Sequence, residues 1–112
     1  MYQNCEKAIK LTIPALRIAV SRSLSSEHGM SETEIAKILG VAQASVSKYL
    51  TGRYSAETKG LVKEIMADNL QHRIVKAITG GAGATETAKI IDSVASDSRL
   101  VDAALGRIRA RA

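Results

Sequence analysis

The chain has 112 residues, enough for one domain or for one small domain with an extension. Hydrophobic residues make up 46% of it, which argues against a disordered chain, whereas aromatic residues make up only 3%, with no Trp or Phe. The formal net charge is +5, and a nucleic acid is the simplest partner for a basic chain.

An all-α fold is the expectation from this composition. The core must be built from Ile, Leu, Val, Ala and Met, proline occurs once, and no alternating apolar and polar pattern predicts a strand. No apolar run approaches the roughly 20 residues that a membrane span requires, and the N-terminus lacks the design of a signal peptide. We therefore expect a cytoplasmic protein that does not bind a membrane.

Few residues of this chain offer catalytic or metal-binding chemistry. The single cysteine, Cys5, excludes an intramolecular disulfide framework and a cysteine metal cluster, and it fits a reducing compartment. His28 and His72 have no carboxylate or cysteine at metal-ligand spacing. No nucleophile and base can be paired from their spacing. The sequence thus predicts no enzyme activity, no catalytic residue, no metal and no cofactor.

The N-terminal part is expected to hold two helical segments separated at the only proline. Asn4 can cap a short helix that runs to about Leu11, and Pro14 forces a break or a kink because it lacks an N–H donor. From Pro14 to about Glu27 the apolar residues share one face of a support helix, which ends at residues 28–29. This inward face consists of Leu16, Ala19, Val20 and Leu24.

Residues 31–52 predict two short helices joined by a turn, and they are the most informative part of the chain. Ser31 can cap the first helix, and Glu34 completes a capping box. Gly40 lies where the chain must reverse, a position that favours a left-handed backbone. The first helix presents an apolar stripe with one small residue that lets the second helix approach: Ile35, Ala36, Ile38 and Leu39.

The second helix, at about residues 42–51, divides into an inner and an outer face. Val46, Tyr49 and Leu50 recur at spacings of three and four and are expected to face the core. Gly52 is the expected C-cap. The outer face is small, polar and cationic, which suits base edges and phosphates: Gln43, Ala44, Ser47 and Lys48.

This segment resembles the helix-turn-helix of the lambdoid repressor and Cro class. The match rests on the spacing of Ile35-Ala36, Gly40-Val41 and Val46. The wider stretch at 14–53 is similar to small archaeal transcriptional regulators with an N-terminal Xre-like domain. Glu32 departs from the class, which usually opens its first helix with a glutamine that contacts phosphate.

The resemblance implies a lambda-repressor-like helical bundle that binds double-stranded DNA as a homodimer, with the second helix in the major groove. Gln43 would bond an adenine edge and Lys48 a guanine or a phosphate, while Ala44 and Ser47 would meet neighbouring bases. A solvated helix face is the alternative for these residues. Some relatives carry an appended ligand-sensing domain, for which this chain is too short, so a small-molecule effector is unknown.

Contacts to the DNA backbone are expected from residues that flank these base readers. Ser45 near the helix start would bond a phosphate through its hydroxyl or amide. Arg53 and Tyr54, just past the second helix, are expected backbone contacts. Weaker candidates are Lys59, Arg17 and Arg22.

The chain is expected to divide into a DNA-binding domain at residues 1–54 and a helical C-terminal region at 55–112. Ser55 can cap a long helix at about 56–78. The apolar stripe of this helix drifts, which predicts a bend or an interruption near Asp68.

The glycine-rich stretch at 79–84 is expected to be a flexible hinge, and Thr85 is expected to cap the helix that follows. A nucleotide-binding loop is the alternative for this stretch. Such a loop needs a preceding strand and a lysine followed by serine or threonine, and the sequence provides neither.

The last segment carries apolar residues at alternating spacings of three and four, which predicts a heptad-like seam that mediates dimerisation. Alternatively, a fresh helix starts at Ser96 or Asp97, and two short helices pack on the core. The seam consists of Ile91, Val94, Val101, Leu105 and Ile108.

The leading hypothesis from the sequence is a sequence-specific, homodimeric DNA-binding transcriptional regulator. A rival is a protein–protein adaptor that uses the C-terminal helices and keeps the helix-turn-helix only as a fold. A third hypothesis is a nucleoid-type binder that lacks sequence preference.

Overall fold

The computed structural model describes residues 2–111, with side chains described for residues 7–97 and 99–107. The described residues form seven helices and no strand, which confirms the all-α prediction. Within this part of the chain, no helix combines the length and the apolar character needed to cross a membrane. The helices are α1 (Tyr2–His28), α2 (Glu32–Leu39), α3 (Gln43–Thr51), α4 (Ala56–Ala67), α5 (His72–Thr79), α6 (Ala84–Ala95) and α7 (Ser98–Arg111).

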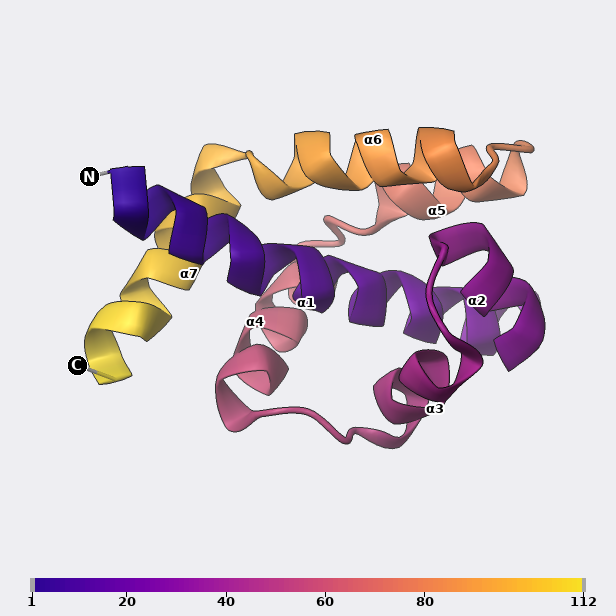
Figure 1. Ribbon diagram of the computed structural model, residues 1–112, viewed down its shortest axis with the longest axis horizontal. Coiled ribbons are helices and arrows are strands. Elements are labelled where there is room, and N and C mark those ends of the chain that lie inside the picture. Colours follow the sequence, from indigo (N-terminus) through magenta and orange to yellow (C-terminus); the bar gives the residue numbers. More distant parts are fainter. Residues whose placement is uncertain (1, 112) are drawn as a thin grey trace.

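Helix α1 is the axis on which the other helices pack (Figure 1). It contacts all of the other helices, most extensively α4 and α7. In Figure 1, α5 and α6 lie above α1, α4 lies below it, α7 crosses behind it near the N-terminus, and α2 and α3 lie toward its C-terminal end. The buried residues of α1 extend from Ala8 to Leu24, so this helix supports both the α2–α3 pair and the C-terminal helices.

Pro14 lies inside α1 and does not end it, so the expected separation into two helical segments is wrong. Thr12, Ala15 and Leu16 around the proline are fully buried, and the Thr12 hydroxyl donates a 2.7 Å hydrogen bond to the Ala8 carbonyl. A proline in a helix interior costs about 3 kcal/mol. Burial of a few aliphatic side chains, each contributing about 1.5–3 kcal/mol, outweighs that cost.

The long helix predicted at 56–78 is interrupted near Asp68, as the drift of its apolar stripe indicated. Helix α4 gives way to α5 through a turn in which Asn69 has a φ of 56°. Asparagine tolerates this left-handed conformation better than most residues. The cap at Ser55 is confirmed, because its Oγ accepts a 3.2 Å hydrogen bond from the Thr58 amide.

The glycine-rich stretch at 79–84 connects α5 to α6, and its predicted hinge motion stays a prediction. Gly81 has a φ of 105°, which only glycine adopts readily. Thr85 does not cap α6, so that expectation is wrong. The N-cap is Gly83, whose carbonyl accepts a 2.9 Å hydrogen bond from the Thr87 amide, and the helix therefore begins before Thr85.

The predicted C-terminal seam is split between two helices, and the alternative of a fresh helix is confirmed. Helix α7 starts just after Asp97, whose Oδ1 accepts a 2.9 Å hydrogen bond from the Arg99 amide. The side chain of Ile108 lies outside the described residues. The apolar residues of both helices pack on the core, buried at Ile91, Val94, Leu100 and Ala104 and half-buried at Val101 and Leu105.

Buried apolar residues from all the helices belong to one core. In this core Ile35 of α2 and Val46 of α3 are as inaccessible as Leu61 of α4 and Ile74 of α5. The core therefore crosses the boundary expected between residues 54 and 55. The division into a DNA-binding domain and a separate C-terminal region stays a prediction.

Candidate nucleic-acid interface

The α2–α3 pair has the turn that its sequence predicts. The Ser31 Oγ accepts a 3.2 Å hydrogen bond from the Glu34 amide, and the Glu34 carboxylate accepts a 3.5 Å hydrogen bond from the Ser31 amide, which confirms the capping box. Gly40 caps the other end of α2 with φ 67° and ψ 33°. The next residue, Val41, donates a 3.1 Å hydrogen bond from its amide to the Ala36 carbonyl and packs against the core. These bonds fix where α3 starts.

The inner face of α3 also follows the prediction. Val46 is fully buried, and Tyr49 and Leu50 are half-buried against the core. In α2, Ile35 is fully buried and Ala36 is only 7% exposed. A small residue such as Ala36 allows α2 and α3 to pack closely. The opposite side of α3 stays free to contact a partner.

The outer face of α3 presents the predicted site residues to different degrees. Gln43, Ala44 and Lys48 are exposed, whereas Ser45 and Ser47 are half-buried. Gln43 and Lys48 make no side-chain hydrogen bond or ion pair with any side chain that the structure describes. Their donors and acceptors are therefore available to bases and phosphates. Ser45 and Ser47 reach solvent with only part of their surface.

The start of α3 has no side-chain cap. Its N-cap is Ala42, which has extended backbone angles (φ −69°, ψ 147°) and offers no oxygen to the first-turn amides. The amides at Gln43 and Ala44 have no partner among the backbone bonds outside the helix, whereas the Ser45 amide donates a 3.0 Å hydrogen bond to the Ala42 carbonyl. Free amides and the helix dipole favour an anion at this end.

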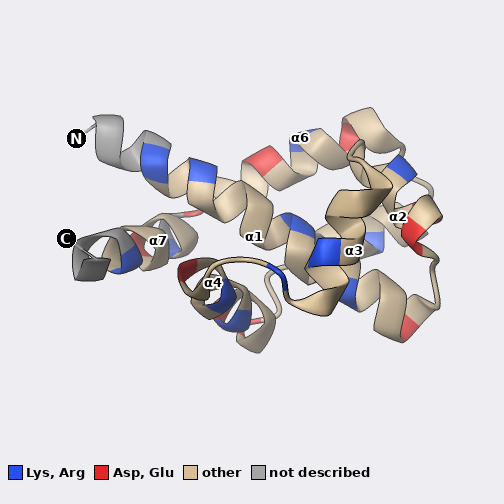
Figure 2. Ribbon diagram, turned by 60° about the horizontal axis from the view of Figure 1, so that its bottom comes forward, with Lys and Arg blue, Asp and Glu red and all other residues tan. Residues whose placement is uncertain are grey.

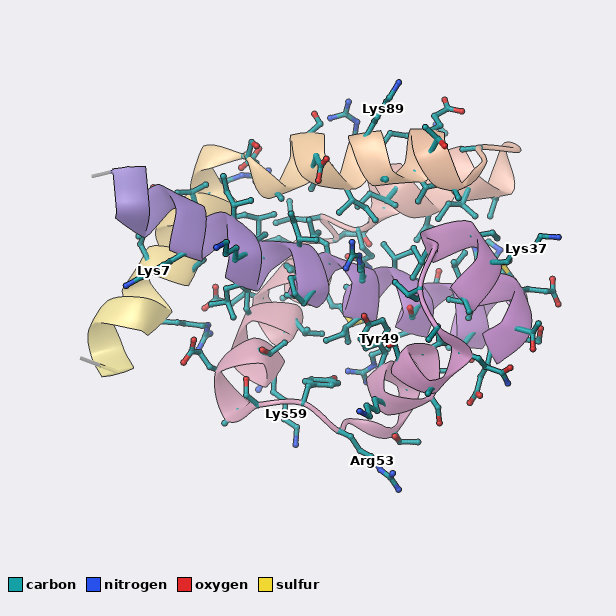
Figure 3. All side chains as sticks on the ribbon, in the orientation of Figure 1. Lys7, Lys37, Tyr49, Arg53, Lys59 and Lys89 are labelled. Atoms are coloured by element: carbon teal, nitrogen blue, oxygen red, sulfur yellow. The ribbon has the colours of Figure 1, made fainter. Side chains whose placement is uncertain are left out.

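The segment after α3 brings two further predicted residues to the surface. Gly52 ends the helix with φ 74° and ψ 21° and confirms the expected C-cap. Arg53 is exposed, and its side chain extends away from the protein (Figure 3). Tyr54 is half-buried, and Lys59 Nζ lies 6.0 Å from the centre of its ring. Only part of the Tyr54 ring is therefore accessible to a partner.

Basic residues gather along this side of the molecule. Figure 2 shows the Lys and Arg segments of α3, of the loop after it and of α4 close together, with acidic segments on both α2 and α4. On α2, Glu34 is held in the capping box, and Glu32, the departure from the resembled class, is half-buried. A partner with a polyanionic backbone would be attracted by Lys48 and Arg53 at the end of α3, whereas the two lysines of α4 share their helix with two glutamates.

The sequence did not predict that residues of α1 and α4 lie close to one another beside this surface. Arg22 of α1 lines a cleft with Lys59 and Lys63 of α4. The spacing of the two lysines, four residues apart on one helix face, was a signal for part of this cluster. Its proximity to α1 depends on how the helices pack and could not be derived from the sequence.

No family model matches this chain, and neither a curated protein nor a solved structure matches it. The resemblance to the lambdoid and Xre-like regulators therefore rests on the residues of the α2–α3 segment alone. Among the described residues, no group of three or more His, Cys, Asp and Glu side chains could hold a metal ion. The side chain of Cys5 lies outside these residues.

Proposed function

We propose that this chain is a sequence-specific DNA-binding transcriptional regulator that inserts α3 into the major groove. The observation that carries the proposal is the division of α3 into two faces. Val46 is fully buried, while Gln43, Ala44 and Lys48 are exposed and free of side-chain partners within the described part of the chain. A helix held by one face and polar on the other is what direct readout of base edges requires.

Each residue has a role that follows from its chemistry. The Gln43 amide is suited to a bidentate bond with adenine N6 and N7, and Lys48 to guanine or a phosphate. Ala44 offers a methyl group to thymine, and Ser47 offers a hydroxyl from the same face. Ser45 contributes its hydroxyl to a phosphate at the helix start, because its amide already donates a hydrogen bond to the Ala42 carbonyl.

Contacts to the DNA backbone fix the register of α3. Arg53 is the leading candidate, because it is exposed, unpaired among the described side chains and placed directly after the helix. Tyr54 follows it and has a hydroxyl that can donate to a phosphate oxygen. A contact by Tyr54 requires its hydroxyl to point outward while its ring stays half-buried.

We also propose that two copies of the chain act together on DNA. One recognition helix covers only a few base pairs, and two-fold pairing on a divided site doubles the contact area. Ile91 and Val94 of the predicted seam are buried inside the protein and cannot contribute to the surface for pairing, whereas Val101 and Leu105 are half-buried. The same burial weakens the adaptor hypothesis, whose motivation was the apolar C-terminal helices.

The test is selection of duplexes from a random library, followed by fluorescence anisotropy with the selected duplex and a scrambled one. The proposal predicts a selected duplex that binds at least about 10³-fold more tightly than the scrambled duplex at physiological salt. A ratio near one would favour the nucleoid-type binder. No binding tighter than about 10⁻⁴ M, the weak limit of typical non-specific affinity, would favour the adaptor.

A further inference from the structure

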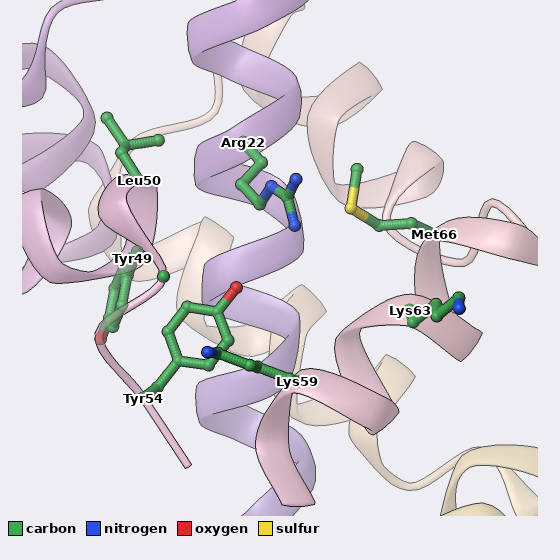
Figure 4. A pocket seen from close by; sticks show the side chains of 8 residues that line it. Arg22, Tyr49, Leu50, Tyr54, Lys59, Lys63 and Met66 are labelled. Atoms are coloured by element: carbon green, nitrogen blue, oxygen red, sulfur yellow. The ribbon is translucent and has the colours of Figure 1, made fainter. Parts of the chain in front are cut away.

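A cleft of about 500 Å³ lies beside the C-terminal end of α3 and next to α1 and α4 (Figure 4). Its walls come from α1, α3, the loop after α3 and α4. The volume lies within the range of about 300–1,000 Å³ that small-molecule sites occupy. Tyr54, Lys59 and Arg22 of this cleft are candidates for contacts to the DNA backbone, but the reading of bases by α3 gives the enclosed space itself no role.

The charged residues of the cleft all have the same sign. Arg22 comes from α1, and Lys59 and Lys63 come from α4, while no carboxylate lines the cleft among the side chains that the structure describes. Within the described part of the chain none of the three forms an ion pair. Positive charges that line one cleft raise the local concentration of anions. The cleft therefore favours an anionic occupant.

The remaining walls are aromatic and apolar. Tyr49 and Tyr54 are half-buried on one side, and Leu50 and Met66 add apolar surface. Lys59 Nζ lies 6.0 Å from the centre of the Tyr54 ring, so a cation and a ring face already share one edge of the space. Rings of this kind stack with the flat face of a base.

We propose that this cleft binds a small phosphorylated aromatic molecule of mononucleotide size. A phosphate monoester carries a charge of about −1.5 to −2 at pH 7 and three acceptor oxygens, which suits three cations better than a monovalent carboxylate does. The phosphate would lie among Arg22, Lys59 and Lys63, and the aromatic ring would lie against the tyrosines. The inference does not rest on DNA binding.

Occupancy of the cleft would act on the same helix that is proposed to read DNA. Tyr49 and Leu50 line the cleft from α3, and Gln43 and Lys48 lie on the exposed face of that helix. A dianion beside α3 would also offset the positive charge near Arg53. The bound molecule would therefore lower the affinity of the chain for DNA.

The test is a titration of the full chain, labelled with ¹⁵N, with the ribonucleoside 5′-monophosphates AMP, GMP, CMP and UMP. At least one should shift the amide resonances of Tyr49, Tyr54 and Lys59 saturably with one site per chain. The matching nucleoside and inorganic phosphate should each bind at least about tenfold more weakly, since loss of one charge-assisted hydrogen bond has that effect.

A pair of double variants locates the site. K59Q/K63Q should weaken binding by about tenfold or more. K37Q/K89Q is the matched control, because both lysines are exposed and extend outward from α2 and α6 (Figure 3). All four substitutions lie on the surface, so unchanged circular dichroism is expected. Equal weakening by both double variants would overturn the proposal.

Two further outcomes would also overturn it. One is the absence of saturable shifts at the cleft with any of the four nucleotides up to about 10 mM. The other is that duplex DNA shifts these resonances while no free nucleotide does, because the cleft would then belong to the DNA interface. Neither result would contradict the proposed reading of bases by α3, which has a separate test.

Discussion

The guanidinium of Arg107 in α7 occupies the space that a Cβ atom at Gly60 of α4 would fill. From this position Nη2 of Arg107 donates a 2.6 Å hydrogen bond to Glu64 Oε1, one turn further along α4. The absence of a side chain at Gly60 therefore lets α7 reach α4. This contact ties the C-terminal helix to the helix that carries two of the cleft lysines.

Gly60→Ala should have two opposing effects on the free energy of unfolding, and their sum depends on Arg107. Alanine in a helix interior is favoured over glycine by about 1 kcal/mol. In the native chain the new Cβ displaces the guanidinium and weakens a partly exposed ion pair that contributes about 0.2–1 kcal/mol. We expect little net change in the free energy of unfolding.

The Arg107→Ala background provides the control for this prediction. There the guanidinium is absent, and Gly60→Ala should stabilise the protein by about 1 kcal/mol in urea unfolding. The same gain in both backgrounds would show that Arg107 does not occupy the space beside Gly60.

Gly40→Ala should destabilise the protein by about 1–2 kcal/mol, the cost of a left-handed conformation for a residue with a Cβ atom. Gly40 has a φ of 67°, and a Cβ there would meet nothing within 4 Å, so the backbone alone decides the effect. Thermal unfolding measures it. Gly106→Ala is the matched control, since Gly106 lies in α7 with open space around it and should gain up to about 1 kcal/mol. Loss of stability in the control alone would contradict the turn geometry.

Lys48→Ala and Arg53→Ala should each weaken DNA binding and make it less dependent on salt. Each side chain that neutralises one phosphate contributes about 0.9 to the slope of log affinity against log salt concentration. Lys89→Ala on α6 is the control and should leave the slope unchanged. If Lys48 contacts a guanine instead, its effect will depend on the DNA sequence and only Arg53 will follow the salt rule. Unchanged slopes in both variants, with folding intact, would place these residues off the DNA.

The parts of the fold that local chemistry decides could be predicted from the sequence. The capping box at Ser31 and Glu34 and the left-handed turns at Gly40 and Gly52 depend on backbone angles and hydrogen bonds within a few residues. The exposure of Gln43 follows from the helical period that buries Val46 on the other side of α3. Such features need no knowledge of distant packing.

The features that could not be predicted from the sequence depend on tertiary contacts. Pro14 is accommodated because the rest of α1 is buried by helices far away in the sequence. The apolar seam was predicted to mediate dimerisation, with packing on the core as the alternative, and its members Ile91 and Val94 are buried inside the same chain. The cleft joins Arg22 to the α4 lysines across a long stretch of sequence, and no periodicity links them.

Reading of bases by α3 depends first on Gln43, so the Gln43→Ala substitution is the decisive test of the proposed function. The measurement is the affinity of the native chain and the variant for the selected duplex and for a scrambled one, at one salt concentration. Loss of a bidentate contact to adenine should cost about 1–3 kcal/mol on the selected duplex and almost nothing on the scrambled one. An equal loss on both duplexes, or no loss on either, would show that Gln43 does not read bases and would contradict the proposed docking of α3.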